Sequence, residues 1–433
     1  MRRRPAGDPM ESVSRPPRRL DTITSPPENT HSSYHVPAAS RDNFCGPAVA
    51  TSTDQLTAHI TTTGLEITKV LKTMKLEDFT VFHNTEFVFG SNLNVVVGEN
   101  GAGKTHVIKA AYAATAVNAT RSNGEIAPLS KSQLQSALAE KFQSVFRPDG
   151  LGRLVRRRRG RRKCALDFKY SDTALNVAFT FSTVAKTEVT LKKAPRRRIE
   201  KLPVYLPTRE LLAIYPGFVS LYETTHLSFE ETWRDTCILL GAPLARGPRE
   251  TRIKEILSPL ETAMNGSVEL DKSGRFYLKS KSGGNMEMHL VAEGMRKLAM
   301  VARLVATGSL LDKGYLFWDE PEANLNPKAL KTIARTILQI AGSGIQVFIA
   351  THSLFLLREL HILQKREFQS FDTRCFGLHI GDEGVVSVQQ GNTMDDIGEI
   401  TALDEDLQQS ERYIDTEMGV PSHSMTFVDK EHV

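Results

Sequence analysis

A glycine-rich loop in the first third of the chain has the residue types and spacing of a phosphate-binding site. Eight consecutive residues fit the pattern G-x-x-x-x-G-K-[ST], namely Gly98, Glu99, Asn100, Gly101, Ala102, Gly103, Lys104 and Thr105. The glycines let backbone N–H groups turn inward around phosphate oxygens, while Lys104 reaches the β- and γ-phosphates and Thr105 offers a hydroxyl to Mg²⁺. An apolar, strand-like run precedes the loop and a helix-like segment follows it. This context favours a nucleotide site over a chance glycine turn.

Two further strand-like segments end in polar residues that suit the same chemistry. "GYLFWDEP" contains Asp319 and Glu320, and "VFIATHS" contains His352. We expect Asp319 to hold Mg²⁺, Glu320 to polarise the attacking water and His352 to sense the γ-phosphate, because ligands gather at the carboxyl ends of parallel strands. Alone, the acidic pair is as typical of a turn, and a lone histidine is more often structural. The phosphate loop favours the functional interpretation.

The segment "LVAEGMRKLAMVARL" predicts a helix with an anion site at its start. Glu293 and Gly294 open the helix, whose first N–H groups lack intrahelical partners. Arg296 and Lys297 would add positive charge there. Without the other motifs, an ordinary amphipathic helix is the stronger interpretation.

A dense basic cluster lies between the phosphate loop and these later motifs. Its cations are Arg153, Arg156, Arg157, Arg158, Arg159, Arg161, Arg162 and Lys163. Contacts with DNA phosphates would each add a salt-sensitive increment of affinity. A solvated loop is the alternative, since charge runs are usually solvated faces. Aromatic residues are not interleaved, so base stacking is not indicated.

The elements that must position these residues alternate between strands and helices, which indicates an α/β fold with a mixed or parallel central sheet. The sequence predicts antiparallel strands at its start and a helical stretch at about 205–265. Strands are expected within residues 65–89, 93–98, 164–170, 175–181, 187–193, 266–290, 315–321 and 345–353. Helices are expected at 104–117, at 130–146 with a Ser130 cap, at 294–308, at 327–342 and at 354–360.

The composition of the chain indicates its domain organisation and its cellular compartment. The chain has 433 residues and a net charge of +5, too balanced to indicate nucleic-acid binding by itself. Residues 1–64, rich in Pro, Ser, Thr and Arg, predict a disordered tail or an over-extended start of the reading frame. Residues 65–433 would form the folded domain, with an acidic segment at about 390–433. The four cysteines lack C-x-x-C spacing and no run is long and apolar enough to span a membrane, so we expect a cytoplasmic protein without membrane partners.

The four motifs, in this order, resemble the ABC-type ATPase heads of the SMC, RecF and OLD families, which are often described as AAA family ATPases. The resemblance covers about residues 66–415. "WDEPEANLNP" looks like Walker B running into the D-loop, and "ATHS" looks like the switch histidine. This resemblance implies a P-loop NTPase fold with a helical second lobe, ATP and Mg²⁺ as cofactors, and a homodimer formed through ATP. It also implies that Lys104, Glu320 and His352 act in hydrolysis.

The chain departs from these families at several points. Ala292 stands where the family signature usually has Ser, and the Q-loop glutamine has no clear counterpart, with Gln143 a weak candidate. Coiled-coil arms and a TOPRIM nuclease are not recognisable. An effector, such as a nuclease or a toxin, would therefore come from a separate chain.

Two hypotheses about function remain open at this stage. The first is an ATP-hydrolysing switch that acts on DNA in repair or antiviral defence. The second is a scaffold in which ATP controls the holding or release of a separately encoded effector, with the acidic C-terminal segment as its docking site. The ATPase of a membrane transporter is a weaker third hypothesis, because of the altered signature and the unplaced glutamine.

Overall fold

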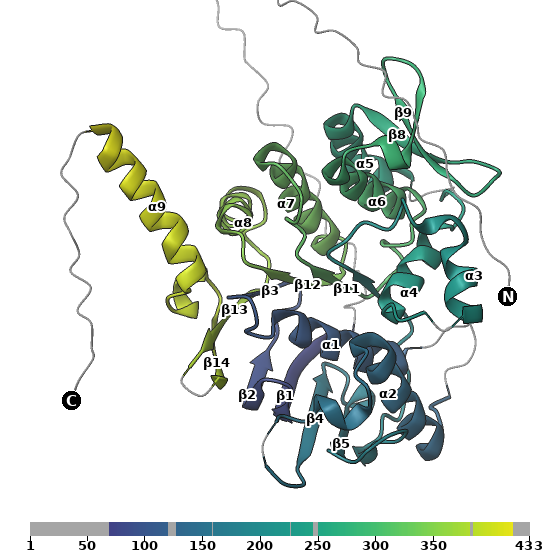
Figure 1. Cartoon of the computed structure of the whole chain (residues 1–433), viewed down its shortest axis with the longest axis vertical. Coiled ribbons are helices and arrows are strands. Elements are labelled where there is room, and N and C mark those ends of the chain that lie inside the picture. The colour runs from purple at the N-terminus through teal and green to yellow at the C-terminus, as the bar shows by residue number, and fades with distance from the viewer. Residues whose placement is uncertain are drawn as a thin grey trace, which may run out of the picture. The chain divides into compact units, whose positions relative to one another are not determined.

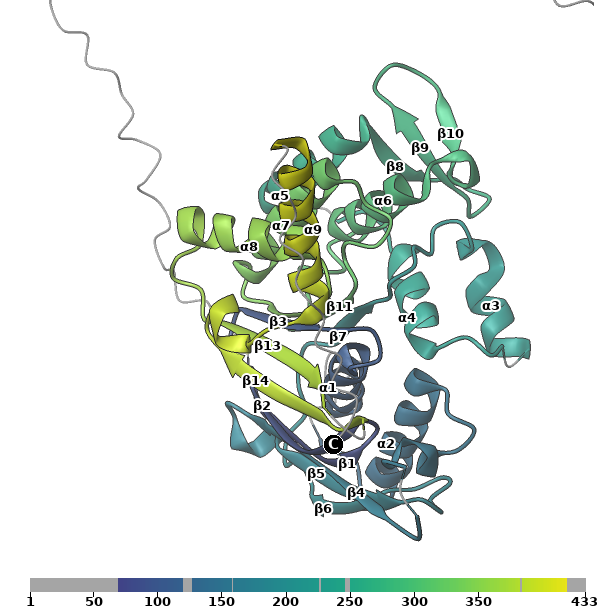
Figure 2. The same ribbon diagram turned by 60° about the vertical axis from the view of Figure 1, so that its left-hand side comes forward.

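Eleven strands of the described chain form one mixed sheet, shown in Figures 1 and 2. The computed structural model describes residues 69–119, 127–157, 159–225, 227–245, 250–381 and 384–418. Four sequence predictions lie outside these residues: those on the tail 1–64, on Cys45, on Arg158 and on the end of the acidic segment, 419–433. The domain boundary at residue 64 therefore stays a prediction.

The strands of this sheet come from both ends of the described chain. They are β1 (Leu71–Phe79), β2 (Phe82–Val88), β3 (Leu93–Gly98), β4 (Lys163–Tyr170), β5 (Val177–Ser182), β6 (Thr190–Lys193), β7 (Pro203–Leu206), β11 (Tyr315–Asp319), β12 (Gln346–Thr351), β13 (Thr373–Ile380) and β14 (Val386–Gly391). Their order is β6-β5-β4-β1-β2-β14-β13-β3-β12-β11-β7. A smaller sheet contains β8 (Gly266–Leu270), β9 (Phe276–Ser280) and β10 (Asn285–Glu287).

Helices connect the strands and cover the sheet. They are α1 (Lys104–Asn118), α2 (Lys131–Phe146), α3 (Tyr215–Thr225), α4 (Glu231–Leu240), α5 (Glu250–Met264), α6 (Glu293–Ala306), α7 (Pro327–Ala341), α8 (Leu354–Glu367) and α9 (Thr401–Met418). Local chemistry explains two helix starts. Ser130 forms a capping box with Gln133, and Asn326 accepts from the Ala329 N–H ahead of Pro327, whose fixed φ suits the first helical position.

The parallel half of the sheet places three motifs at one edge. β13, β3, β12, β11 and β7 run parallel, and β12 lies between β3 and β11. The carboxyl ends of these three strands therefore meet. The phosphate loop follows β3, Asp319 ends β11 and His352 follows β12.

The antiparallel half joins this parallel half along a thin seam between β2 and β14. Only the pair Val386–Phe82 registers as a ladder pair there. The Gln390 side chain continues the contact, since its Oε1 accepts from Val88 N–H at 2.9 Å and its Nε2 donates to Glu86 O at 3.0 Å. A side-chain amide thus takes the place of a regular backbone ladder.

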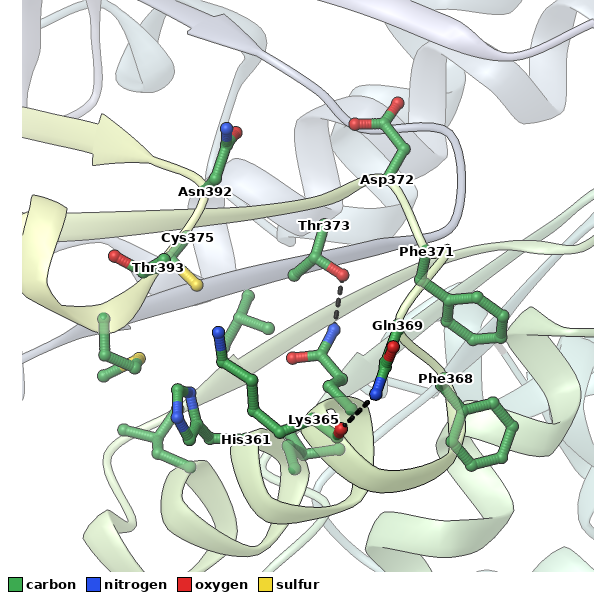
Figure 3. Close-up of a pocket in the computed structure, with 15 residues that line it drawn as sticks. His361, Lys365, Phe368, Gln369, Phe371, Asp372, Thr373, Cys375, Asn392 and Thr393 are labelled. Carbon is green, nitrogen blue, oxygen red and sulfur yellow. Dashed lines mark hydrogen bonds between the residues drawn. The ribbon is translucent and has the colours of Figure 1, made fainter.

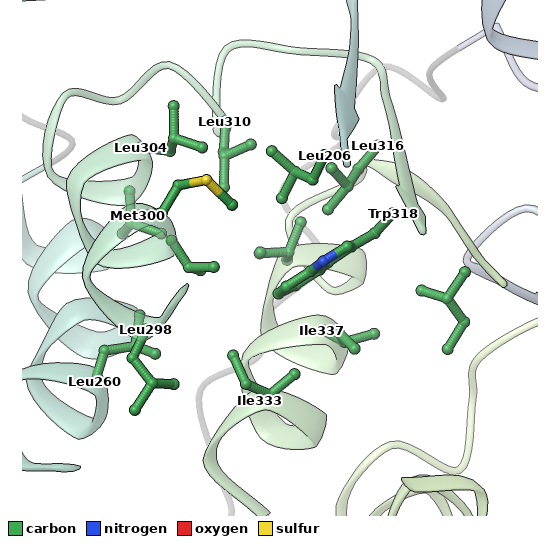
Figure 4. Packing of buried hydrophobic residues seen from close by; sticks show 14 of the residues in the cluster. Leu206, Leu260, Leu298, Met300, Leu304, Leu310, Leu316, Trp318, Ile333 and Ile337 are labelled. Atoms are coloured by element: carbon green, nitrogen blue, oxygen red, sulfur yellow. The ribbon is translucent and has the colours of Figure 1, made fainter. Parts of the chain in front are cut away.

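Two apolar clusters lie on opposite faces of the parallel strands, because successive side chains of a strand point to opposite faces. Val95 and Val97 of β3 pack into the cluster with α6, α7 and α8, whereas Val96 packs into the cluster with α1 and α2. Figure 4 shows Trp318 of β11 beside Ile333 and Ile337 of α7 in the first cluster. Burial on both faces explains why these strands are continuous apolar runs in the sequence.

The observed elements confirm the predicted α/β fold with a mixed sheet, an antiparallel N-terminal portion and a helical insertion. The stretch at about 205–265 is mostly helical, as predicted, and contains α3, α4 and α5. It begins at the end of β7, where "PVYL" pairs with β11 at the edge of the sheet. The strands β13 and β14 and the helix α9 were not expected.

Candidate functional site

The phosphate loop adopts a conformation that depends on its glycines. Gly101 and Gly103 have φ angles of 87° and 95°, in the left-handed region that other residues rarely adopt. A side chain at Gly103 would also meet Val81 Cγ2 at 2.7 Å. The Lys104 ammonium donates to the carbonyls of Gly98 at 2.8 Å and Glu99 at 3.0 Å. It therefore lies inside the loop, where a phosphate group would compete for it.

Thr105 and Asp319 meet although 214 residues separate them. The Thr105 hydroxyl donates to Asp319 Oδ1 at 3.0 Å, and the Tyr205 hydroxyl of β7 donates to Oδ2 at 3.2 Å. A hydroxyl beside a carboxylate, both near the phosphate loop, is the kind of oxygen-ligand pair that suits Mg²⁺. These residues therefore fit the predicted metal, which would complete its shell with phosphate oxygens and water.

Glu320 and His352 are neighbours at the same edge. His352 Nδ1 lies 3.6 Å from Glu320 Oε1, and both side chains are partly open to solvent. Glu320 has a φ of 45°, which is unusual for a residue with a side chain, and its N–H donates to Ala350 O at 2.9 Å. Such local backbone strain is typical of functional positions.

A third carboxylate, Glu322, ties this edge together from inside. Its side chain is only 6% exposed. Oε1 accepts from the Thr351 hydroxyl at 2.7 Å and from the His352 N–H at 3.0 Å. Glu322 therefore holds the end of β12, and with it the backbone of His352, against the turn that follows β11. We call Asp319, Glu320 and Glu322 the carboxylate edge.

The start of α6 packs directly on this turn. A side chain at Gly294 would meet the Asn324 carbonyl oxygen at 2.4 Å, so the close approach requires glycine. Lys297 is almost fully buried and donates to the carbonyls of Glu320 at 2.6 Å and Ala323 at 3.3 Å. Arg296 donates to Glu210 and to Val291 O.

These contacts correct one expectation about the α6 start. Arg296 and Lys297 were predicted to add positive charge to an anion site. Both instead bind groups within the chain, because α6 is held against the turn after Walker B. Ala292 and Glu293 at the helix start are exposed, while Gly294 is half-buried.

Burial dominates the electrostatics of the site. It raises the pKa of the Asp319 carboxyl to about 6, although the bond from Thr105 and the charge of Lys109 act in the opposite direction. It lowers the pKa of the Lys297 ammonium to about 8 and also lowers that of Lys104. For both lysines the nearby carboxylates act against this shift, which favours keeping cations and anions together.

Three residues of the predicted basic cluster lie beside the phosphate loop. Arg153, Arg156 and Arg157 line a cleft of about 640 Å³ together with Arg147 and His106. We call this the arginine cleft. Arg159, Arg161, Arg162 and Lys163 are exposed beyond it.

The remaining surfaces add no second catalytic centre among the described residues. A cavity of about 410 Å³ between α8 and β13 contains none of the predicted site residues (Figure 3). The Gln143 amide donates to Lys186 O, a contact outside the phosphate loop. Within the described ranges no group of three His, Cys, Asp or Glu side chains could hold a metal. The described helices include none that is long and apolar enough to cross a membrane.

Sequence reasoning missed the contacts of three residues of the site. Tyr205 lies on a four-residue strand with no motif around it. Lys297 was expected to add charge to an anion site, and its contacts with the turn after β11 were not foreseen. Glu322 did carry a weak signal, since it is the second acid of "WDEPEANLNP". Its burial depends on β12, which is distant in sequence.

Comparisons with known proteins agree with this geometry. Residues 93–358 match the family described as AAA domain, putative AbiEii toxin, Type IV TA system. No curated protein sequence matches the chain significantly.

Similar solved structures include three SMC heads. The SMC head domain from Thermotoga maritima is 13% identical, with 73% of this chain and 97% of that chain covered and a TM-score of 0.39. An SmcHead bound to the C-winged helix domain of ScpA is 15% identical, with coverages of 75% and 98% and a TM-score of 0.45. The Smc head with an extended coiled coil bound to the C-terminal domain of ScpA, from Pyrococcus furiosus, is 13% identical, with coverages of 79% and 99% and a TM-score of 0.44.

The family match extends from β3, which leads into the phosphate loop, to α8, which follows His352, and so includes every element that carries the carboxylate edge. It spans more than half of the chain. The chain therefore belongs to the family of AAA domains described as putative AbiEii toxin, Type IV TA system, and is an ABC/AAA-type P-loop ATPase in its fold.

Proposed function

We propose that the protein is a switch driven by ATP binding and hydrolysis. The observation that carries this proposal is the convergence of Lys104, Thr105 and Asp319 with Glu320 and His352 at one sheet edge. Loop N–H groups and Lys104 would bind the phosphates. Thr105 and Asp319 would hold Mg²⁺, which supplies charge neutralisation on the phosphate oxygens when bound.

The chain's own residues suit an in-line attack by water. Glu320 would accept a proton as the water oxygen bonds to the γ-phosphorus and the bond to the β–γ bridging oxygen breaks, giving ADP and phosphate. His352, 3.6 Å from Glu320, would contact the γ-phosphate and respond to its loss. Through Glu322 and Lys297 this response would reach β12 and α6.

Dimerisation would complete the cycle. Ala292 and Glu293 lie exposed at the start of α6, where a second copy could approach with its bound nucleotide. Ala292 lacks the hydroxyl that would contact a γ-phosphate, so backbone N–H groups near Gly294 would serve instead. We propose that this dimer acts in DNA repair or antiviral defence, and the exposed arginines favour DNA as the trigger.

The ATPase rate with and without duplex DNA tests this function. We expect Mg²⁺-dependent hydrolysis that DNA accelerates, and a loss of at least 100-fold in Glu320→Gln with nucleotide binding retained. Glu359→Gln, on α8, is the matched control. Activity that survives in Glu320→Gln would overturn the assigned general base.

The scaffold remains a second candidate because of α9. Its side chains from Glu405 to Met418 are exposed, and Leu407, Ile414 and Met418 lie at spacings that share one helix face. An 18-residue helix with an exposed apolar stripe is marginal alone. A separately encoded effector would bury this stripe.

Co-purification with the product of a neighbouring gene, with and without ATP, tests the scaffold. We expect the double variant Leu407→Asp and Ile414→Asp to lose the effector while its ATPase rate is unchanged. Retention of the effector by this variant would exclude α9 as the docking site.

A further inference from the structure

The arginine cleft contains a buried arginine, Arg156, with one guanidinium nitrogen that has no hydrogen-bond partner among the described residues. Arg156 is 9% exposed, and its Nη1 is buried without a hydrogen-bond partner. Its backbone is fixed, since Arg156 N–H donates to Asp78 O at 2.8 Å and Val155 pairs with Phe79. A buried guanidinium without a counter-charge is costly, so this arrangement indicates that an anion completes it.

The surroundings of Arg156 reinforce the need for an anion. Within the described residues, no carboxylate lies within ion-pair distance of Arg153, Arg156 or Arg157, although Asp149 also lines the cleft. Arg147 donates only to Leu227 O, at 3.3 Å. Elsewhere on the surface, arginines such as Arg234 and Arg335 form ion pairs with carboxylates. The cleft thus brings several arginines without ion pairs close together.

The cleft adjoins the phosphate loop. Val81 lines the cleft and also faces Gly103, and His106 follows Thr105 on α1. His106 Nδ1 is likewise buried without a hydrogen-bond partner. Burial and the neighbouring Lys109 lower the pKa of His106 to about 4, so the ring is neutral near pH 7 and adds polarity without charge.

The arrangement of the cations along a row indicates which kind of anion would bind. The cations do not end at the cleft, because exposed cations continue from it to the start of β4, namely Arg159, Arg161, Arg162 and Lys163. A single phosphate would occupy only the buried end of this row. A linear polyanion would occupy all of it, and arginine forks match phosphate oxygens in pairs.

We propose that the arginine cleft binds the phosphodiester backbone of a nucleic-acid strand, with one phosphate seated on Arg156 and the following phosphates on the exposed cations. The site is separate from the nucleotide-binding loop, although it shares the wall formed by Val81. This proposal deepens the proposed function by giving DNA a contact surface, but nucleic-acid binding itself does not require hydrolysis.

The test measures DNA and nucleotide binding on the same variants of the full chain. Fluorescence anisotropy of a labelled 20-base-pair duplex, without ATP, measures DNA binding to the cleft. A fluorescent ATP analogue measures nucleotide binding to the phosphate loop. We expect Arg156→Gln and Arg157→Gln each to weaken DNA binding about tenfold and to lower the slope of log K against log salt by about 0.9, while ATP-analogue binding changes less than twofold.

Two control variants distinguish an effect of the cleft from the loss of any surface charge and from an effect on the ATP site. Arg366→Gln, an exposed arginine of α8, should leave DNA affinity within twofold. Lys104→Ala should abolish ATP-analogue binding and leave DNA binding intact, so failure of the ATPase proposal is distinguishable. Because Arg157 is exposed, Arg157→Gln should have the same melting temperature as wild type. This variant therefore still tests the proposal if Arg156→Gln does not fold.

Two results would overturn the proposal. If Arg156→Gln and Arg157→Gln weaken the ATP analogue but not DNA, the cleft belongs to the nucleotide site. If inorganic phosphate at millimolar concentration displaces the duplex at constant ionic strength, the cleft binds a single free phosphate and not a strand. Displacement by a second, unlabelled duplex with no effect of phosphate is the expected result.

Discussion

The carboxylate edge and the arginine cleft lie on two sides of the same phosphate loop, and they differ in how the chain treats their charges. At the edge, Asp319 and Glu322 are buried and each accepts two hydrogen bonds from the chain, although Glu322 Oε2 has no partner. In the cleft, Arg156 is 9% exposed and its Nη1 has no hydrogen-bond partner among the described residues. The carboxylates at the edge are therefore held by bonds within the chain, whereas the cation in the cleft is left for a ligand to complete.

Removing a buried side chain should change the stability of the fold in opposite directions in the two regions. Removing a buried group that others depend on leaves their donors or acceptors unsatisfied and destabilises the fold. Removing a buried charge that has no partner relieves a desolvation cost. Substitutions at the carboxylate edge should therefore lower the free energy of unfolding, whereas removal of the Arg156 charge should leave it unchanged or raise it.

Glu322→Ala should destabilise the protein by about 3 kcal/mol. The Thr351 hydroxyl and the His352 N–H would lose their acceptor in a buried position. Urea unfolding followed by circular dichroism measures this change. Glu405→Ala, on the exposed face of α9, should change stability by less than about 0.5 kcal/mol. Equal stability of the Glu322 variant and wild type would show that the edge is not preorganised.

Lys297→Met should cost about 2 kcal/mol near pH 7.5, because the carbonyls of Glu320 and Ala323 lose a donor. The cost should grow with pH. Burial lowers the pKa of Lys297 from its ordinary value of 10.5 to about 8 in the folded chain. Between these values the unfolded chain binds more protons, so wild type gains stability as pH rises.

Urea midpoints at pH 7.5 and 9.5 check this dependence. The difference between wild type and Lys297→Met should increase by roughly 1–2 kcal/mol at the higher pH. If the stability difference between wild type and Lys297→Met decreases as pH rises, burial does not lower the pKa of Lys297.

Gly294→Ala should destabilise the protein by about 1–2 kcal/mol, although alanine is the better helix former. The new methyl would meet the Asn324 carbonyl at 2.4 Å and push α6 from the turn. The same variant should lower the ATPase rate. A stabilised variant would show that this contact has no role in positioning the edge. Gly308, after α6, is unsuitable as a control because its φ is 70°.

Arg156→Met should leave stability unchanged or raise it by up to about 1 kcal/mol when nucleic acid is absent. The methionine keeps much of the apolar stem and removes the unpaired charge. Thermal melts of wild type and variant at low salt measure the effect. A loss of more than about 1 kcal/mol would show that Arg156 is a structural residue and would remove the contrast between the two regions.

Much of the fold was predictable because its signals are local. β3 has the bounds expected for "LNVVVG", and the Ser130 cap and α7 also appear where their residues predicted them. β7 and β13 escaped prediction for physical reasons. β7 has only four residues, and Arg374, Gly377 and His379 interrupt the apolar pattern of β13.

The site was predictable in its motifs and not in its supports. The residues of Walker A, of Walker B and around His352 lie together as the sequence indicated, although their roles stay proposals. The contacts of Tyr205, Glu322 and Lys297 depend on residues 23 to 114 positions away, which no local pattern reports. The arginine run was visible in the sequence. Burial of Arg156 was not, since only tertiary structure separates it from its exposed neighbours.

The seam between β2 and β14 gives the large sheet an uneven stiffness. The other neighbouring strands share ladders of several pairs, but here a single ladder pair and the Gln390 amide join the edges of two plates, the antiparallel and the parallel half of the sheet. Beyond the seam, Gln346 of β12 also exchanges hydrogen bonds with the Leu71 backbone of β1. Few hydrogen bonds make such a joint compliant to torsion, so amides of β14 facing β2 should exchange with solvent faster than those of β3. Val81 belongs to one plate and approaches Gly103, which follows a strand of the other. A small twist at the seam would therefore alter the spacing between the arginine cleft and the phosphate loop.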